Sequence, residues 1–417
     1  MKLSVLLLLA AAVLPLSAEN LLRNPGFEAE SRMPWQSWPG PCSVGTQDPA
    51  SGAQCMDVPA LADKTEYLLQ KSIPAEPGFA YVCTLKSRAD DVTSPLIVHL
   101  IFRDAAGAVT NGSRIITCDP SADWMKSRGA GVAAESAATV DVSIEVPPGS
   151  GTFHIDDVTL EKGGRILGEH GTARIERTET GLRLVSPFYT LDFTEKRNYN
   201  LAGAVFGGRK LLRHFFFSVP EEKTKTPPGI GGSCVVTGLE VKERDGRFSF
   251  LVEECFPRMK VKRILEFYDG EPYIKFACEV KALNDFSCRQ AALNFGFSGS
   301  VIARGRESTV TYTKWSRPGC WFTLDRPDAP RVLSFLDGNG KNGIALIGLN
   351  KTSWEELPGK MLSNTSGMTG DGFGIELTKW SRREIRTGDR VAWEVLVSPV
   401  ENHEKAVELA DRICIAD

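Results

Sequence analysis

Two segments decide the fold of the first part of the chain: Asn20-Leu21-Leu22-Arg23-Asn24-Pro25-Gly26-Phe27-Glu28 near its start, and Phe153-His154-Ile155-Asp156-Asp157-Val158-Thr159-Leu160 near its end. The runs between them alternate apolar and polar side chains or are continuously apolar, at residues 80–86, 96–102, 113–117 and 139–146. Gly, Pro, Asp and Asn separate these runs, as turns between short strands require. The pattern predicts an all-β domain folded as a β-sandwich.

Acidic residues stand at both ends of this domain. Glu28 lies near the first expected strand, and Asp156 and Asp157 lie on the last. If the two terminal strands pair, these carboxylates meet, and like charges a few ångströms apart need a cation or a proton between them. The alternative is that all three are solvated carboxylates on the surface.

Further residues of this region form one pattern together with the two quoted segments. They are Trp35, Pro77-Gly78-Phe79-Ala80-Tyr81, Leu85-Lys86-Ser87-Arg88-Ala89 and Trp124. In order and spacing, the set resembles the jelly-roll carbohydrate-binding modules of families 4 and 9, which accompany bacterial cellulases and xylanases. The resemblance implies a jelly-roll module over residues 19–163. It also implies a structural Ca²⁺, an ion that prefers oxygen ligands, held by Glu28 and Asp156 with Asp157 in reserve.

Sugar binding needs a flat aromatic face together with polar side chains that bond to hydroxyl groups. In the first region Trp38 and Gln36, in a Pro-flanked loop, supply this pair. We therefore expect both residues to contact carbohydrate. The alternative is that Trp38 anchors a packed loop and that the domain is a structural spacer.

The second region begins after a short linker, expected at residues 164–172. Residues 173–417 are rich in strand-like runs, and only residues 402–413 place apolar side chains at helical spacing. This predicts a large β-supersandwich that ends in a short helix. In the succession of its strands and turns, the region resembles galactose-mutarotase-like supersandwich domains. This resemblance implies an architecture and not an activity. Mutarotases use His and Glu as acid and base, and none of the histidines here lies in a matching context.

A five-residue repeat stands out in the second region. Thr313-Lys314-Trp315-Ser316-Arg317 recurs as Thr378-Lys379-Trp380-Ser381-Arg382. One interpretation is a repeated shelf, in which Trp315 and Trp380 stack on a sugar ring and Arg317 and Arg382 reach its polar groups. The other is that both Trp are core residues and each Arg lies at the rim, its stem packed on apolar surface.

The first 18 residues have the parts of an export signal: Lys2, an apolar run at residues 3–13 and a small residue, Ala18, at the cleavage point. The run is shorter than the roughly 20 apolar residues of a spanning helix. We therefore expect a signal peptide at residues 1–18, export to the periplasm, cell surface or medium, and no transmembrane segment afterwards. Lys and Arg total 49 and Asp and Glu 52, without a basic stripe, so no nucleic-acid partner is expected.

Ten cysteines follow the expected signal, four in the first region and six in the second. Even numbers in each region and an oxidising compartment predict at least one disulfide bond per domain. Cys42 and Cys55 are the most local candidate pair.

The sequence therefore predicts a secreted, noncatalytic carbohydrate-binding protein associated with the recognition or degradation of a polysaccharide. One alternative is a carbohydrate-active enzyme, a glycoside hydrolase, polysaccharide lyase or sugar epimerase-like protein, with its site in the second domain. Another is a structural or adhesive envelope protein in which both domains are spacers.

Overall fold

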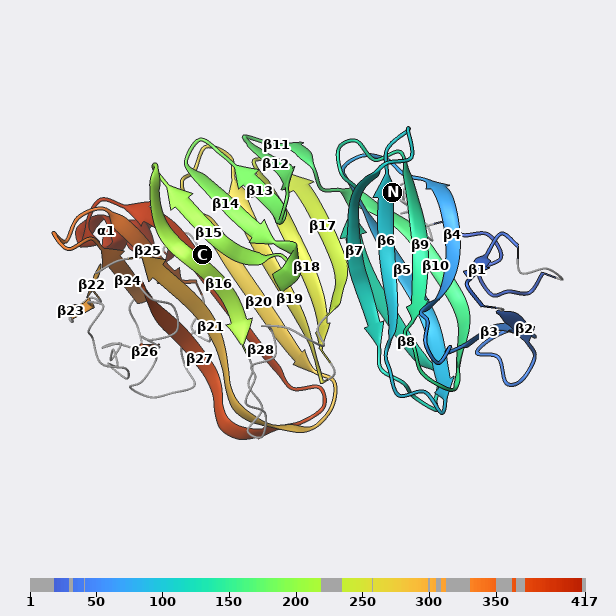
Figure 1. The fold of residues 1–417 in the computed structure, drawn as a ribbon. Coiled ribbons are helices and arrows are strands. Elements are labelled where there is room, and N and C mark those ends of the chain that lie inside the picture. Colours follow the sequence, from blue (N-terminus) through green and yellow to red (C-terminus); the bar gives the residue numbers. More distant parts are fainter. Residues whose placement is uncertain are drawn as a thin grey trace, which may run out of the picture.

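The computed structural model describes residues 19–29, 33–40, 42–218, 235–256, 258–298, 301–304, 309–312, 331–349, 362–364 and 372–414. The expected signal peptide lies outside these residues. The described residues form an all-β structure with one α-helix near the C-terminal end, as the sequence predicts. Two sandwiches lie side by side (Figure 1). No helix in the described part of the chain is long and apolar enough to span a membrane.

The first sandwich consists of two five-stranded antiparallel sheets. Its strands are β1 (Gln36–Trp38), β2 (Ser43–Gly45), β3 (Cys55–Pro59), β4 (Glu66–Pro74), β5 (Phe79–Asp90), β6 (Leu96–Arg103), β7 (Val109–Cys118), β8 (Met125–Val132), β9 (Thr139–Val146) and β10 (Thr152–Arg165). Sheet A has the order β1-β4-β9-β6-β7, and sheet B has the order β2-β3-β10-β5-β8. From β3 to β10 the chain crosses between the sheets, and the last strand lies between β3 and β5. This is the strand order of a jelly roll.

Alternation along the strands builds the core of the first sandwich. In β6 the inward side chains Leu96, Val98, Leu100 and Phe102 are fully buried, and the residues between them are partly exposed. In β10 the inward positions change parity, from Phe153 and Ile155 to Val158 and Leu160, because the register shifts between Asp156 and Thr159. A bulge of this kind re-aims side chains at the edge of a site.

The N-terminal segment runs along β10 without forming a strand of its own. Leu21 N–H donates to Leu160 O (2.8 Å), and Val158 N–H donates to Pro25 O (2.9 Å). The Asn20 side chain bonds to the backbone of both Val158 and Leu160. Phe27 is fully buried against Trp35, with ring centroids 5.6 Å apart. The two segments that decide the fold from sequence are therefore in contact.

The second sandwich consists of two nine-stranded antiparallel sheets. Sheet C contains β11 (Gly168–His170), β12 (Ala173–Thr178), β13 (Gly181–Val185), β14 (Tyr189–Thr194), β15 (Asn200–Phe206), β16 (Arg209–Ser218), β21 (Phe286–Ser298), β27 (Gly372–Ile385) and β26 (Leu362–Asn364). Sheet D contains β17 (Val235–Arg244), β18 (Arg247–Phe256), β19 (Met259–Tyr268), β20 (Ile274–Ala282), β28 (Arg390–Val400), β25 (Gly343–Gly348), β24 (Arg331–Leu336), β22 (Val301–Arg304) and β23 (Thr309–Tyr312). These large sheets agree with the predicted supersandwich. The predicted linker includes the end of β10 and strand β11.

Helix α1 (His403–Cys414) covers one end of sheet D, as the apolar spacing predicts. Ala406 and Ala410 are fully buried against Val332 and Leu336 of β24 and residues of β25 and β28. Leu409 and Ile413 pack at the border of the same cluster. One face of the helix therefore closes a small core of its own.

The two sandwiches share apolar packing. Ala80 and Val82 of β5 and Ala130 and Val132 of β8 belong to the main core cluster of the second sandwich. Strand β17 contacts β8, β10, β5 and β7 of the first sandwich. Glu195, in the short helix η1 (Glu195–Arg197), accepts a hydrogen bond from Ser113 on β7. Part of the outer face of sheet B is thus covered by the second sandwich.

The predicted disulfide between Cys42 and Cys55 is wrong. Neither these two cysteines nor Cys83 and Cys118 form a disulfide bond, so the described first sandwich contains none. The Cys42 thiol donates to Glu66, whereas Cys55 lies on β3 with its thiol directed to Asp57. Burial and the Asp57 carboxylate raise the pKa of Cys55 to about 12.

In the second sandwich, Cys255 and Cys278 are free as well. The other four cysteines of this region, Cys234, Cys288, Cys320 and Cys414, have side chains outside the described part. The even count of cysteines therefore did not predict pairing among the described cysteines.

A buried ion pair within sheet D includes an arginine that also bonds to a turn of sheet C. Arg263 Nε donates to Glu254 Oε2 (2.7 Å), and both side chains are at most 4 % exposed. The same guanidinium donates to the backbone carbonyls of Asn198 and Tyr199, in the turn that follows η1 in sheet C. Breaking such a pair leaves an uncompensated charge in the interior.

We predict that Glu254→Gln lowers the free energy of unfolding by about 3–5 kcal/mol, because the charge of Arg263 stays buried without its partner. Urea unfolding of the full chain measures this change. Glu408→Gln is the matched control, because Glu408 pairs with Lys405 on the exposed face of α1 and water screens that pair. Equal effects of the two substitutions would contradict the account.

Candidate functional site

The outer face of sheet A carries an exposed aromatic pair. Trp38 on β1 lies opposite Tyr67 on β4, and Gln36 lies opposite Leu69. Because Leu68 is buried in the core, alternation directs Tyr67 and Leu69, and with them Trp38 and Gln36, outward. Trp38 is 65 % exposed and is the one aromatic residue among the exposed large apolar side chains of the described residues. Its ring is stacked on that of Tyr67, with centroids 6.2 Å apart and planes at 26°.

Buried groups on both sides of β1 hold this short edge strand in place. Before it, Trp35 is fully buried and its indole N–H donates to Asn24 O (3.2 Å). After it, Gly40 N–H donates to the fully buried carboxylate of Glu66 (2.5 Å). A Cβ on Gly40 would come within 2.6 Å of this carboxylate, so the close approach requires glycine. Trp38 is thus fixed between two anchors and is exposed without belonging to a loose loop.

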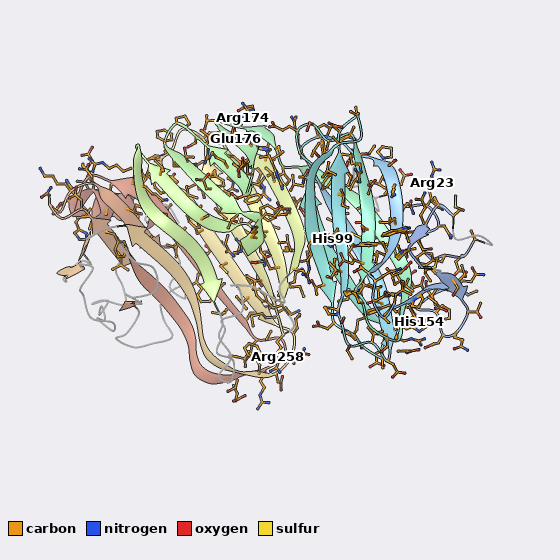
Figure 2. All side chains as sticks on the ribbon, viewed as in Figure 1. Arg23, His99, His154, Arg174, Glu176 and Arg258 are labelled. Atoms are coloured by element: carbon orange, nitrogen blue, oxygen red, sulfur yellow. The ribbon has the colours of Figure 1, made fainter. Side chains whose placement is uncertain are left out.

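Polar side chains continue the face beside the aromatic pair. In the register of sheet A, Tyr67 lies opposite Glu145 of β9, and Glu145 lies opposite Ile97 of β6. His99 Nε2 lies 3.2 Å from Glu145 Oε2, and Arg103 Nε donates to Asp141 (2.7 Å). Figure 2 labels His99 on this sheet. We name this surface the sheet A face and define it by Gln36, Trp38, Tyr67, Leu69, His99 and Glu145; Asp141 and Ser143 of β9 are buried beneath it.

The sheet A face has the composition that sugar binding requires. Two stacked rings offer an apolar surface to the C–H face of a pyranose, and carboxylate, imidazole and amide groups beside them can bond to hydroxyls. Sequence reasoning selected Trp38 and Gln36, and the structure places both on this face. It missed Tyr67, Glu145 and His99, because only the pairing of β4, β9 and β6 brings them there. The available signal was the alternation of apolar and polar residues along their strands, which places these three side chains at outward positions.

The predicted metal residues surround the loop at residues 50–54. Asp156 is fully buried, and its carboxylate accepts the backbone N–H of Ser51 (3.0 Å) and of Asp157 (2.7 Å). Glu28 Oε1 accepts the backbone N–H groups of Ala53 (2.9 Å) and Gln54 (3.1 Å). A Cβ on Gly26 would lie 3.7 Å from both Asp156 Oδ1 and Glu28 Cγ. The side chains from the two ends of the sandwich therefore both bond to the backbone of this loop.

The two neighbouring aspartates differ in charge environment. Burial raises the pKa of Asp156, although the backbone N–H bonds oppose the shift. Burial also acts to raise the pKa of Asp157, but hydrogen bonds from Lys86 and Ser51 and the charge of Lys86 outweigh it, and the net pKa is lowered. Lys86 Nζ lies 2.7 Å from Asp157 Oδ2. Asp157 already has a cation, so as a calcium ligand it fits poorly.

Glu28 and Asp156 fit calcium better than Asp157 does. Both offer carboxylate oxygens, the hard donors that Ca²⁺ takes, and the raised pKa of buried Asp156 is a penalty that a cation would relieve. The carboxylate oxygens of Glu28, Asp156 and Asp157 do not all lie within 4.8 Å of one another. Among the described residues, the one group of three potential ligands that meets this limit lies elsewhere. Backbone carbonyls would have to complete the coordination.

The structure describes only the second copy of the five-residue repeat, and only its backbone. Trp315 and Arg317 lie outside the described residues. Trp380 and Arg382 belong to β27, whose register against β21 shifts between the pairs Gln290–Ser381 and Ala291–Lys379. Only the backbone is described there, so the predicted Trp–Arg shelf stays a prediction.

Comparison with known proteins gives no family assignment. No family model matches the sequence, and no curated protein matches it. Solved structures similar to part of the chain include the CBM22-1 xylan-binding domain from Paenibacillus barcinonensis, with a TM-score of 0.31, 13 % identity and coverage of 35 % of this chain and 96 % of that domain. A family 16 carbohydrate-binding module has a TM-score of 0.29, 16 % identity and coverage of 34 % of this chain and 99 % of the module.

A third such structure is a CBM61 module solved in complex with β-1,4-galactotriose. Its TM-score is 0.27 at 18 % identity, and the match covers 34 % of this chain and 98 % of the module. Each match extends over about one domain length. At these scores and identities, the likenesses assign neither an activity nor a ligand to this chain.

Proposed function

We propose that the chain is an exported, noncatalytic carbohydrate-binding protein, in which the module at residues 19–163 binds an uncharged polysaccharide on the sheet A face. The observation that carries the proposal is Trp38, stacked on Tyr67, fixed by buried neighbours and still 65 % exposed. A ligand that covers an exposed apolar ring removes it from water, and this contributes favourably to the free energy of binding. Rigid placement also lowers the entropic cost of binding, because no loop has to be ordered.

The polar groups beside the rings support a sugar over a purely apolar ligand. Glu145 lies opposite Tyr67 in the register and is partly exposed, and Gln36 shares the edge strand with Trp38. A pyranose has apolar C–H faces and a rim of hydroxyls, which matches rings flanked by carboxylate and amide groups. The near balance of positive and negative charge, 49 against 52, also suits an uncharged polymer.

The second sandwich is proposed to be a galactose-mutarotase-like supersandwich without catalytic function. Its broad apolar contact with sheet B supports a role in fixing the first sandwich in orientation. Export rests on the signal-like segment at residues 1–18. The calcium at Glu28 and Asp156 is proposed to be structural, because these residues bind the backbone of the loop at residues 50–54, away from the sheet A face.

We predict that Trp38→Ala weakens polysaccharide binding by about thirtyfold. Covering one indole face removes roughly 80 Å² of apolar surface from water, which corresponds to about 2 kcal/mol. Affinity electrophoresis of the full chain in gels with soluble xylan or β-1,4-galactan measures the effect; one similar module is named as xylan-binding and another was solved with β-1,4-galactotriose. Melting should change little, because Trp38 is exposed.

Trp124→Ala is the matched control for this experiment. Trp124 lies next to β8 of sheet B, where its indole N–H donates to Asp48 O (2.9 Å) and Arg88 lies over its ring. This variant should retain wild-type affinity. Undiminished binding by the Trp38 variant, or binding lost only in the Trp124 variant, would refute the sheet A face as the binding surface.

For the structural calcium, we predict that the chelator EGTA lowers the melting temperature of the full chain and that added Ca²⁺ restores it. A ligand that binds only the native state stabilises it by mass action. In Glu28→Gln, which keeps the size of the side chain but removes its charge, the response to Ca²⁺ should be much reduced. Identical melting curves with and without Ca²⁺ in the wild-type chain would exclude the ion.

A further inference from the structure

A second group of side chains lies on the outer face of sheet B and has no role in the proposed function. In β3, Met56 and Val58 point into the core, so alternation directs Cys55 and Asp57 outward. Asp57 lies opposite His154 of β10 in the register. Figure 2 labels His154 near β3, apart from His99 on the other sheet. Pairing of β3 with β10 thus brings a thiol, a carboxylate and an imidazole together.

The distances in this group suit a tetrahedral metal ion. One ligand atom from each of Cys55, Asp57 and His154 lies within 4.8 Å of the other two, the one such group among the described residues. His154 Nδ1 lies 2.7 Å from Asp57 Oδ1, and Cys55 Sγ lies 3.7 Å from the same oxygen. Around tetrahedral zinc, S, N and O ligands are about 3.3–3.6 Å apart. Small side-chain rotations therefore suffice to place an ion among them.

The surroundings of His154 match those of a metal-bound imidazole. Its second nitrogen, Nε2, lies 3.0 Å from Asp90 Oδ2, and metal-binding histidines usually bond through the free nitrogen to a carboxylate. This contact fixes the ring with Nδ1 toward Asp57 and Cys55. His154 is 8 % exposed and Cys55 fully buried, whereas the Asp57 side chain is 29 % exposed. The group is therefore rigid on the inside and reaches solvent at Asp57.

Gly45 of β2 makes room for this carboxylate. A Cβ on Gly45 would lie 2.4 Å from Asp57 Oδ2, so any other residue would displace the aspartate. The backbone of the neighbouring strand thus fits closely around Asp57.

We propose that Cys55, Asp57 and His154 bind a zinc-type divalent ion, with Asp90 as a positioning residue for the imidazole and water as the fourth ligand. The mixed S, N and O donor set selects zinc over calcium or magnesium, which take oxygen ligands. Neither Glu28 nor Asp156 is a ligand of this site, and the site does not depend on glycan binding by the sheet A face.

Zinc alone, added to the metal-free full chain, tests the proposal. Equilibrium dialysis with elemental analysis should give a bound zinc whose affinity each of Cys55→Ser, Asp57→Asn and His154→Gln lowers by at least about tenfold, because loss of a partner that only orients a ligand already costs that much. His99→Gln, the matched histidine substitution on the sheet A face, should bind zinc as the wild type does. Asp57→Asn keeps the side-chain size at a partly exposed position, so it should leave the fold intact by circular dichroism.

Cobalt(II) in place of zinc reports the ligands directly. The wild type and His99→Gln should give a thiolate-to-cobalt charge-transfer band and the visible bands of a tetrahedral site, and Cys55→Ser should lack the charge-transfer band. Asp90→Asn should weaken cobalt binding but keep that band, because it alters only the support of the imidazole. Zinc affinity unchanged in the folded Asp57→Asn and His154→Gln variants, or cobalt bound without a Cys55-dependent thiolate band, would overturn the proposal.

Discussion

The pairing of β10 with β3 and β5 is the constraint on which the first sandwich depends. The last strand of the jelly roll enters the middle of sheet B, and its residues Phe153, Ile155, Val158 and Leu160 complete the core. The N-terminal segment then attaches to the end of β10 through Asn20, Leu21 and Pro25. Because β10 has neighbours on both sides, a slip of one residue would turn its apolar side chains outward. The register is therefore strongly specified.

The bulge in β10 explains why the same strand carries two different polar groups. Before the bulge, His154 points outward toward Asp57 and Asp90. At the bulge, Asp156 and the left-handed residue Asp157 (φ 49°) turn toward the loop at residues 50–54. Beyond it, alternation resumes with opposite parity. One irregularity thus separates the carboxylates that bond to the loop at residues 50–54 from the Cys55–Asp57–His154 group.

The two outer faces of the first sandwich have different surroundings. Ala80, Val82, Ala130 and Val132 give sheet B an apolar end, which packs against the second sandwich. Sheet A has Trp38 and Tyr67 with a row of charged and polar side chains. The exposed ring of Trp38 within this polar surface supports the proposed binding site. The division between the packing face and the proposed binding face follows from which strand residues point outward on each sheet.

Much of the fold could be predicted from the sequence, because alternation and turn residues are local signals. The apolar spacing at residues 402–413 identified helix α1, and the quoted segments at both ends of the first sandwich identified their mutual contact. What depends on strand pairing could not be predicted. Tyr67 and Glu145 are far apart in sequence and meet only in the register of β4 and β9. The disulfide predicted from the even number of cysteines does not form, because Cys42 and Cys55 bond to Glu66 and Asp57 instead of to each other.

The central claim is that a polysaccharide lies over the indole of Trp38. The chain has eight tryptophans, so its indole N–H resonances form a small set that Trp-to-Phe substitutions can assign. Titration of the ¹⁵N-labelled full chain with xylo- or galacto-oligosaccharides should shift the Trp38 indole resonance and leave those of the buried residues Trp35 and Trp393 in place. An oligosaccharide that binds without moving the Trp38 resonance would contradict the account.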